Sequence, residues 1–255
     1  MTNIALLVPA LNESAGMQRT ARVMREALDS GVVSSATVLD GGSDDDTVEV
    51  ALQFGIRSLH IPSVQPELGP VLGKGDSLFR GVHTVPADWY VFLDADLGNI
   101  SLDHVTALTQ HIGEPGISFV KGGFVRVDEH GVPREIPAGR VTELVGRPLL
   151  RRVAPGLTGL SQPLSGQVAI EAKLAKSLSF VTGYGVEIAM LIDVFRAVGA
   201  EGIVEADMGF INNRYKPDDA LEEVRDQVLA GAALRIVTMP EYGLVVHNSV
   251  TNRDY

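Results

Sequence analysis

Two carboxylates separated by one residue follow an apolar segment in the first half of the chain. Asp94 and Asp96 flank Ala95 and come directly after the apolar residues 89–93. This pattern indicates a buried strand that ends with both acids at the carboxyl edge of a sheet, where open α/β sheets bind ligands. Because alternate residues of a strand point the same way, both carboxylates could face one divalent cation, whose other ligands would be phosphate oxygens and water. The pattern favours a metal-nucleotide site; the alternative is that both acids only solvate the strand end and cap a helix near Ser101.

A lysine between two glycines, Gly73-Lys74-Gly75, is a second candidate for phosphate chemistry. The glycines allow the backbone to approach a ligand closely, and the ammonium supplies a positive charge for phosphate. The preceding residues 62–70 are rich in proline and glycine and predict an irregular segment. The alternative is a helix start with a solvated lysine. The spacing from Gly69 does not match a nucleotide-binding phosphate loop, and the six histidines do not cluster at zinc-site spacing.

The composition excludes several other classes of protein. The 255 residues are 45% hydrophobic, the formal net charge is -11, and the chain has no cysteine. An acidic protein lacks the basic face of a general nucleic-acid binder, and charged residues interrupt the longest apolar stretch, 186–198, so no segment is expected to span a membrane. We expect a cytoplasmic protein that binds neither nucleic acid nor membrane, and in which an anionic substrate meets a local cation.

The elements that would position these groups alternate between strand and helix over the first hundred residues. Strands are expected at residues 4–8, 36–39, 57–61 and 89–93. A helix capped by Asn12 or Ser14 should run to about Leu28, and three acids at 44–46 should lie at the N-terminus of another helix. This alternation predicts an α/β protein with a parallel sheet of nucleotide-binding type.

The second half follows a different pattern. Residues 117–127 are expected to form two extended strands interrupted by glycines 122 and 123. Residues 140–153 should be helical until Pro148 ends or kinks the helix, and amphipathic helices are expected at 186–198 and 218–237. We predict one domain over residues 1–255, with a nucleotide-sugar half at 1–123 and an acceptor half at 124–255 that contains the C-terminal helix.

Several segments, taken in order, carry a family resemblance. Pro-Ala-Leu-Asn-Glu at 9–13, Asp-Gly-Gly-Ser at 40–43, Gly-Lys-Gly at 73–75 and Asp-Ala-Asp at 94–96 resemble the nucleotide-sugar glycosyltransferases of the GT-A fold. Segments 139–150, 162–166 and 183–193 closely resemble the glucosyl-3-phosphoglycerate synthase family, and the resemblance covers roughly residues 4 to 235. It implies the GT-A fold, a Rossmann-like, mostly parallel sheet flanked by helices.

The resemblance also implies an activity. A retaining hexosyltransferase of this family would move glucose from UDP-glucose to the 2-hydroxyl of 3-phosphoglycerate, require Mg²⁺ or Mn²⁺, and form a homodimer. Two alternatives stay open: a related glycosyltransferase with a different small or polyprenyl-phosphate acceptor, and a non-catalytic nucleotide-sugar-binding protein. The lack of a membrane anchor in the sequence argues against a lipid acceptor.

Site roles transfer from the family to matching positions of this chain. The implied catalytic residues are Asp96, Lys74 and Glu187, and the implied metal ligands are Asp96 and Asn213. The implied donor-binding residues are Pro9, Ala10, Leu11, Asn12, Glu13, Gly41, Lys74, Asp94, Ala95, Tyr184, Gly185, Val186, Glu187, Ile211, Asn212, Asn213, Arg214, Tyr215 and Lys216. The implied acceptor-binding residues are Gly139, Arg140, Val141, Thr142 and Tyr215. Arg140 offers a planar fork suited to phosphate or carboxylate, although it could also be a surface helix charge.

Three positions depart from the family pattern. Asn213 stands where the family has a histidine as its second metal ligand, and Tyr215 stands where it has an acceptor-contacting asparagine. Gln167 stands where a glutamate is usual. Because an asparagine carbonyl still suits a hard cation such as Mg²⁺ but is a weaker ligand than imidazole for softer ions, these changes bear on metal affinity and acceptor identity.

Overall fold

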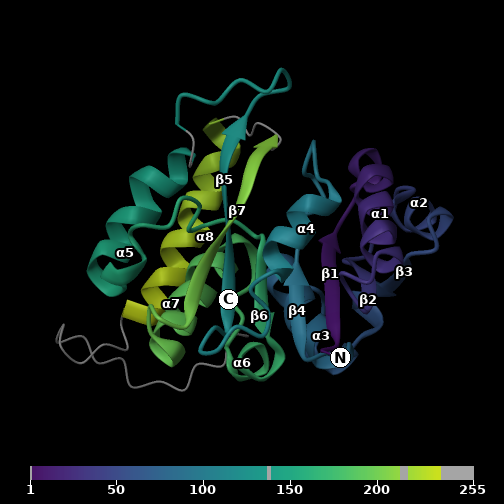
Figure 1. Ribbon diagram of the computed structural model, residues 1–255, viewed down its shortest axis with the longest axis horizontal. Coiled ribbons are helices and arrows are strands. Elements are labelled where there is room, and N and C mark those ends of the chain that lie inside the picture. The colour runs from purple at the N-terminus through teal and green to yellow at the C-terminus, as the bar shows by residue number, and fades with distance from the viewer. Residues whose placement is uncertain (1, 137–138, 213–217, 237–255) are drawn as a thin grey trace.

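Seven strands form one mixed sheet in the computed structural model, which describes residues 2–136, 139–212 and 218–236 (Figure 1). The sheet order is β3-β2-β1-β4-β6-β5-β7, and only β6 runs against the other strands. The strands are β1 (Ile4–Ala10), β2 (Ser35–Asp40), β3 (Arg57–His60), β4 (Trp89–Phe92), β5 (Phe119–Val127), β6 (Val168–Glu171) and β7 (Ile203–Asn212). The predicted α/β class and mostly parallel sheet are confirmed.

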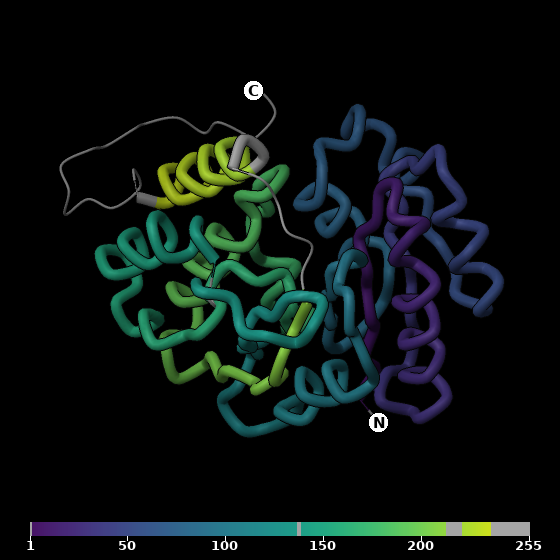
Figure 2. The backbone as a smooth tube through the Cα atoms, turned by 90° about the horizontal axis from the view of Figure 1, so that it is seen from above, coloured from purple at the N-terminus to yellow at the C-terminus, as the bar shows by residue number. Residues whose placement is uncertain are grey.

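Strand alternation divides the apolar side chains between two cores. On β1, Ala5 and Leu7 belong to one core, whereas Leu6 and Val8 belong to the other, and all four are fully buried. Helices α1 (Ser14–Asp29), α2 (Thr47–Gln53) and α4 (Leu102–Thr109) cover the second core. Helices α3 (Lys74–Thr84), α5 (Arg147–Val153), α6 (Ala172–Ser177), α7 (Val186–Val198) and α8 (Asp218–Ile236) cover the first. Figure 2 shows the N-terminal half, purple to blue, beside the later half, green to yellow.

The sheet opens where β1 and β4 stop pairing. Their register ends at Leu7 opposite Phe92, although β1 continues beside β2 to Ala10. Pro9 therefore lies beyond the end of the β4 ladder, where its missing N–H leaves no gap in the hydrogen bonding. Beyond this point β1 and β4 are no longer paired with each other.

The expected pair of strands at 117–127 is wrong, because this segment is the single strand β5. Its pairing with β7 is irregular only between Gly123 and Val125. Gly122 and Gly123 serve close packing and make no turn: a Cβ on Gly123 would lie 2.6 Å from Ser161 Oγ, and one on Gly122 would lie 3.0 Å from the Gln167 carbonyl. Strands β6 and β7 and helix α6 were not predicted.

Helix termini also differ in part from expectation. Neither Asn12 nor Ser14 caps α1; Glu13 occupies the cap position, and Asn12 Oδ1 accepts a hydrogen bond from the Asp44 N–H at 2.9 Å. Ser101 itself caps α4 in a reciprocal box with His104, so neither aspartate at 94 or 96 is needed as its cap.

The helix around Pro148 is irregular, but Pro148 does not end it, because α5 continues through this residue to Val153. A π-helical turn at Thr142–Gly146 comes directly before α5, and Pro148 lies in the first turn of α5, where its missing N–H is tolerated. The described part of the predicted helix at 218–237 is helical, as α8. Among the described helices, none has the length and apolar character needed to cross a bilayer.

Candidate active site

A cleft of about 930 Å³ opens at the carboxyl edge of the sheet, and residues from both halves line it. The predicted site residues in its wall are Pro9, Ala10, Leu11, Glu13, Gly41, Lys74, Asp94, Ala95, Asp96, Gly139, Arg140, Val141, Thr142, Tyr184 and Glu187. The structure therefore brings together positions from the first strand loop and from the start of α7. This is the edge at which open α/β sheets bind ligands.

Lys74 joins two carboxylates at the floor of this cleft. It is the first residue of α3; Asp94 follows β4, and Glu187 lies in the first turn of α7. Lys74 Nζ donates to Glu187 Oε1 at 2.7 Å and also to Asp94 Oδ1. The Lys74 side chain is only 16% exposed, so it is not the solvated lysine of the alternative interpretation. Burial would lower the pKa of Lys74, but the two carboxylates raise it, so the ammonium stays charged.

Asp94 is fully engaged by its neighbours. Its second oxygen accepts a hydrogen bond from Gln167 Nε2 at 2.8 Å. Burial would raise the pKa of Asp94, but the Lys74 ammonium and the Gln167 amide hold it below its usual value. At the position where the family pattern has a glutamate, Gln167 thus supplies a donor to Asp94. A carboxylate there would instead face another carboxylate.

The contacts of Asp94 bear on the prediction that Asp94 and Asp96 could face one cation. Asp94 is held by Lys74 and Gln167, and Asp96 lines the cleft two residues further on, so we keep Asp96 as the candidate metal ligand of the pair. The described residues contain no group of three or more histidines and acids that could hold an ion. One carboxylate fits a hard cation that takes most of its ligands from a bound diphosphate. The second predicted ligand, Asn213, lies outside the described residues.

Glycines allow the charged groups to approach one another. A Cβ on Gly166 would lie 2.5 Å from Asp94 Oδ1 and would collide with the Lys74 ammonium. Gly73, with φ of 85°, would carry its Cβ 3.3 Å from Gly183 Cα. A Cβ on Gly75 would overlap the Val181 carbonyl. The two glycines around Lys74 thus allow α3 to pack closely against the segment before α7, in addition to any role toward a ligand.

A second lysine lies beneath this cluster and was not predicted. Lys121 on β5 is 1% exposed, and its Nζ donates to the Ser165 carbonyl at 2.6 Å. Burial lowers the pKa of Lys121 to about 8, against the opposing effect of Glu187. A small cavity that also touches Lys74 and Glu187 adjoins it. Lys121 is thus a buried cation under the floor of the cleft.

Arginines gather on the opposite wall, beside the predicted acceptor segment 139–142. Arg126, Arg134 and Arg140 all line the cleft. The Arg126 guanidinium lies 5.8 Å from the centre of the Phe124 ring, and burial lowers its pKa. Arg134 Nε donates to the Val127 carbonyl at 3.2 Å. Only Arg140 was predicted from sequence. Arg126 lies on β5, where arginine usually marks a solvated face, and Arg134 lies in the irregular segment after β5.

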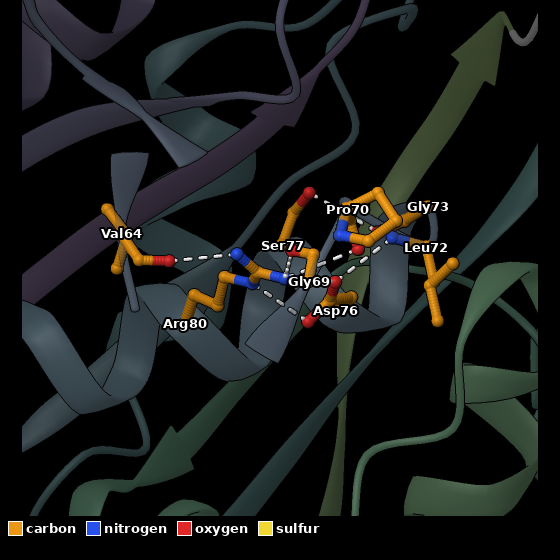
Figure 3. A network of polar contacts seen from close by, with 8 residues as sticks. All are labelled: Val64, Gly69, Pro70, Leu72, Gly73, Asp76, Ser77 and Arg80. Atoms are coloured by element: carbon orange, nitrogen blue, oxygen red, sulfur yellow. Dashed lines mark hydrogen bonds and ion pairs between the residues drawn. The ribbon is translucent and has the colours of Figure 1, made fainter. Parts of the chain in front are cut away.

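The wall between β3 and α3 is ordered by one buried arginine (Figure 3). Arg80 is fully buried and donates to the carbonyls of Val64 at 2.8 Å and Gly69 at 2.9 Å. It also pairs with Asp76 at 3.0 Å, and Asp76 accepts the Leu72 N–H at 3.0 Å. The proline- and glycine-rich segment before Lys74 is therefore fastened at several points, and it includes two short 3₁₀ turns.

Helix α8 contributes a wall that the sequence did not predict. Glu223, Val224 and Gln227 line the cleft. Gln227 Oε1 accepts the Tyr184 N–H at 2.6 Å, so α8 holds the segment that begins α7.

Several predicted donor-binding residues do not line the cleft in the structure. Asn12 holds the turn after β2, and Gly185 packs against α8, where a Cβ would lie 2.6 Å from the Gln227 carbonyl. Val186 and Ile211 are buried in the cores, and the backbone of Asn212 pairs with Gly98 and Asn99. Asn213, Arg214, Tyr215 and Lys216 lie outside the described residues, so their predicted roles stay untested.

Comparisons with known proteins agree with this geometry. No protein-family model matches the chain. Glucosyl-3-phosphoglycerate synthase of Mycobacterium tuberculosis is 38% identical over 233 residues, which cover 89% of this chain and 71% of that protein. The enzyme of the same name from Petrotoga mobilis is 34% identical over 209 residues, or 80% of this chain and 64% of its own.

Solved structures give the same picture. The M. tuberculosis synthase in complex with Mn²⁺, UDP and glucosyl-3-phosphoglycerate superposes with a TM-score of 0.83 at 36% identity, covering 92% of this chain and 80% of that one. Mannosyl-3-phosphoglycerate synthase from Rubrobacter xylanophilus superposes with a TM-score of 0.88 at 26% identity, covering 98% and 78%. Both comparisons support the predicted GT-A fold.

Proposed function

Because this chain belongs to the glucosyl-3-phosphoglycerate synthase family of glycosyltransferases, we propose that it transfers glucose from UDP-glucose to the 2-hydroxyl of 3-phosphoglycerate, with retention at the anomeric carbon. The observation that carries the proposal is the joint placement of Lys74, Asp96 and Glu187 in one cleft. These are the three catalytic positions of the family pattern, and they come from segments up to 113 residues apart.

The first half of the cleft suits a nucleotide diphosphate. The backbone at Pro9, Ala10 and Leu11, together with Gly41, forms one wall, and Lys74 lies on the floor. In this proposal the nucleoside occupies the wall, and the diphosphate lies between Lys74 and Asp96. A divalent cation held by Asp96 would neutralise charge on the departing UDP, as Mn²⁺ is bound together with UDP in the M. tuberculosis structure.

The three charged residues have separate tasks in this mechanism. Lys74 would place a fixed ammonium beside the leaving phosphate, where charge builds up in the transition state. Glu187, oriented by Lys74 at 2.7 Å, would face the sugar and stabilise positive charge at the anomeric carbon. Because Lys74 holds both Asp94 and Glu187, neither acid is placed as a free nucleophile. The proposal is therefore front-face attack, in which the leaving phosphate takes the proton of the acceptor hydroxyl.

The acceptor would occupy the second half of the cleft. Segment 139–142 begins a helical stretch at Arg140, and Gly139 has φ of 89°, which turns the chain into it. Arg140 would bind the phosphate of the acceptor, helped by the backbone N–H groups of this segment. The arginines on this wall supply the local cations that an acidic chain with a net charge of -11 needs for an anionic acceptor.

A second candidate function concerns the donor. The higher TM-score, 0.88, belongs to a mannosyl-3-phosphoglycerate synthase. That likeness favours GDP-mannose as the donor to test against UDP-glucose, with the same acceptor. The identity of 26%, compared with 38% to the glucosyl enzyme, ranks it second.

Assembly and location complete the proposal. We expect a cytoplasmic homodimer to which α8 contributes, since Leu229 and Leu234 on this helix are 41% and 46% exposed. Light scattering at micromolar concentration would show twice the monomer mass, and a monomer under those conditions would contradict this part.

The function is tested by incubating the protein with 3-phosphoglycerate, Mn²⁺ and one donor at a time: UDP-glucose, ADP-glucose or GDP-mannose. Mass spectrometry should detect the hexosyl-3-phosphoglycerate product with UDP-glucose, and NMR should assign the α-anomer expected for retention. Product from GDP-mannose alone would establish the second candidate. Binding of UDP without any product would instead support a non-catalytic nucleotide-sugar-binding protein.

A further inference from the structure

Arg126, on the cleft wall beside segment 139–142, has no role in the mechanism proposed so far. Arg126 projects from β5 into the cleft, and its Nε is buried without a hydrogen-bond partner among the described residues. Leaving a buried N–H of a guanidinium unsatisfied is costly, because the lost hydration is not replaced. A ligand that accepts from Arg126 would remove this cost. The position is therefore built for an anion that arrives with a substrate.

The surroundings of Arg126 place it between the two halves of the site. A Cβ added to Gly139, the first residue of the acceptor segment, would lie 3.5 Å from Arg126 Nε. Burial lowers the pKa of Arg126, and Arg134 lowers it further, whereas the charges of Asp94 and Asp96 raise it. Arg126 thus borders both the acceptor segment and the two acids that follow β4.

We propose that Arg126 binds the carboxylate of the acceptor, while Arg140 and its segment bind the phosphate. This inference rests on the proposed function, in which the acceptor is a 2-hydroxy acid with a phosphate at carbon 3. The carboxylate is bonded directly to the carbon that carries the attacking hydroxyl, and the phosphate is attached to the next carbon. The carboxylate must therefore lie closer to the reacting bond. The charges of Asp94 and Asp96, the acids at the reaction edge, act on Arg126, and its buried Nε lies in the same cleft.

Arg126 is well held for such a contact. Its guanidinium lies against the Phe124 ring, which limits its orientations, and a guanidinium can bind both oxygens of a carboxylate at once. A carboxylate bound there would also screen Arg126 from Arg134, whose charge is unfavourable to it. Arg126 thereby becomes a residue that selects a hydroxy acid over a simple alcohol.

The test compares two ligands that differ at the carboxylate. Wild type, Arg126→Met and Arg126→Lys are each saturated with UDP and Mn²⁺ and titrated calorimetrically with 3-phosphoglycerate and with glycerol 3-phosphate. Methionine keeps an unbranched stem over Phe124 and removes the charge. Arg126→Met should weaken 3-phosphoglycerate binding at least tenfold and glycerol 3-phosphate binding less than twofold. Arg126→Lys should give an intermediate, equally selective loss, and it serves as the readout if the methionine variant does not fold.

The control is Arg151→Met, which removes an exposed arginine of α5 outside the cleft and should change neither constant. Equal weakening of both ligands by the Arg126 variants would overturn the assignment to the carboxylate, and unchanged binding would overturn any contact with the acceptor. A wild-type protein that binds neither ligand and forms no product would refute the proposed acceptor itself, which is a separate failure from an unselective Arg126 variant.

Discussion

Replacing Lys74 with methionine removes the cation that two buried carboxylates share. Lys74 and Glu187 are 16% and 12% exposed, and their charged atoms are 2.7 Å apart. At an effective dielectric constant of about 20, unit charges at this separation attract by about 6 kcal/mol. Much of that attraction offsets the cost of burying the ions, so the expected net loss is the roughly 3–5 kcal/mol typical of breaking a buried pair by removing one partner.

The pH dependence of this loss follows from Asp94. In the wild type, Lys74 keeps the pKa of Asp94 below its usual value. The ionised Asp94 therefore stabilises the fold above about pH 4, and this stabilisation is lost as the pH falls through the native pKa. In Lys74→Met, burial acts without that cation, and we expect the pKa of Asp94 to rise above the unfolded value. The variant should then lose stability as the pH rises through this higher value. Its deficit relative to the wild type should be larger at pH 8 than at pH 5.

Urea denaturation at pH 5 and pH 8 measures both effects, with Lys173→Met on the exposed side of α6 as the control. The double variant Lys74→Met/Asp94→Asn removes one of the stranded charges and should recover at least half of the stability lost at pH 8. It should not recover turnover, which we expect to fall at least a hundredfold because the leaving phosphate loses its fixed cation. A loss below about 1 kcal/mol at pH 8, or the same deficit at both pH values, would refute the electrostatic reasoning.

Three further predictions concern the same cleft. Asp96→Asn should retain the fold and lower turnover at least a hundredfold, and a variant with more than a tenth of wild-type activity would exclude Asp96 as the metal ligand. Gly166→Ala should lower turnover at least tenfold by displacing the ion pair beside it, whereas Gly159→Ala, whose Cβ meets nothing within 4 Å, should not. Lys121 has a pKa of about 8 in the native state and 10.5 when unfolded, so the unfolded state binds more protons between these values. The free energy of unfolding of the wild type should therefore rise by roughly 3 kcal/mol relative to that of Lys121→Met between pH 7.5 and 10.5. Denaturation curves in which this difference stays constant with pH would contradict the buried charge.

The strands β1, β2 and β4 were predictable because each contains a short apolar run between polar turns, whereas β3 has only one apolar residue, Leu59. The strand at Trp89–Phe92 and its two following acids are the clearest case. In the second half, β6 has only four residues, and β7 carries Glu205 and Asp207 within its length, so neither shows a clear strand pattern. Their places depend on pairing with distant strands, which local sequence does not encode.

The sequence predicted which segments form the site, but it did not predict which side chains contact each other there. Family resemblance brought Lys74 and Glu187 into one site, but only the structure shows that one ammonium joins Glu187 to Asp94. Lys121 and Arg126 were missed because a cation within a strand usually faces water. Here both face the cleft or its floor, where neighbouring acids offset part of the cost of their burial.

The hydrogen bond between Tyr184 and Gln227 affects how early during synthesis of the chain the cleft can bind a donor. Contacts at the site join residues 74 with 187, 94 with 167, and 184 with 227, which are 113, 73 and 43 positions apart. Contacts of this kind form late in folding, because long loops must close before they are made. Lys74 and Asp94 pair with each other, yet they lack Glu187 and Gln167 until those residues emerge from the ribosome. Residues of α8 form the last part of the cleft wall. A donor can therefore bind in the completed cleft only after almost all of the described residues have been synthesised.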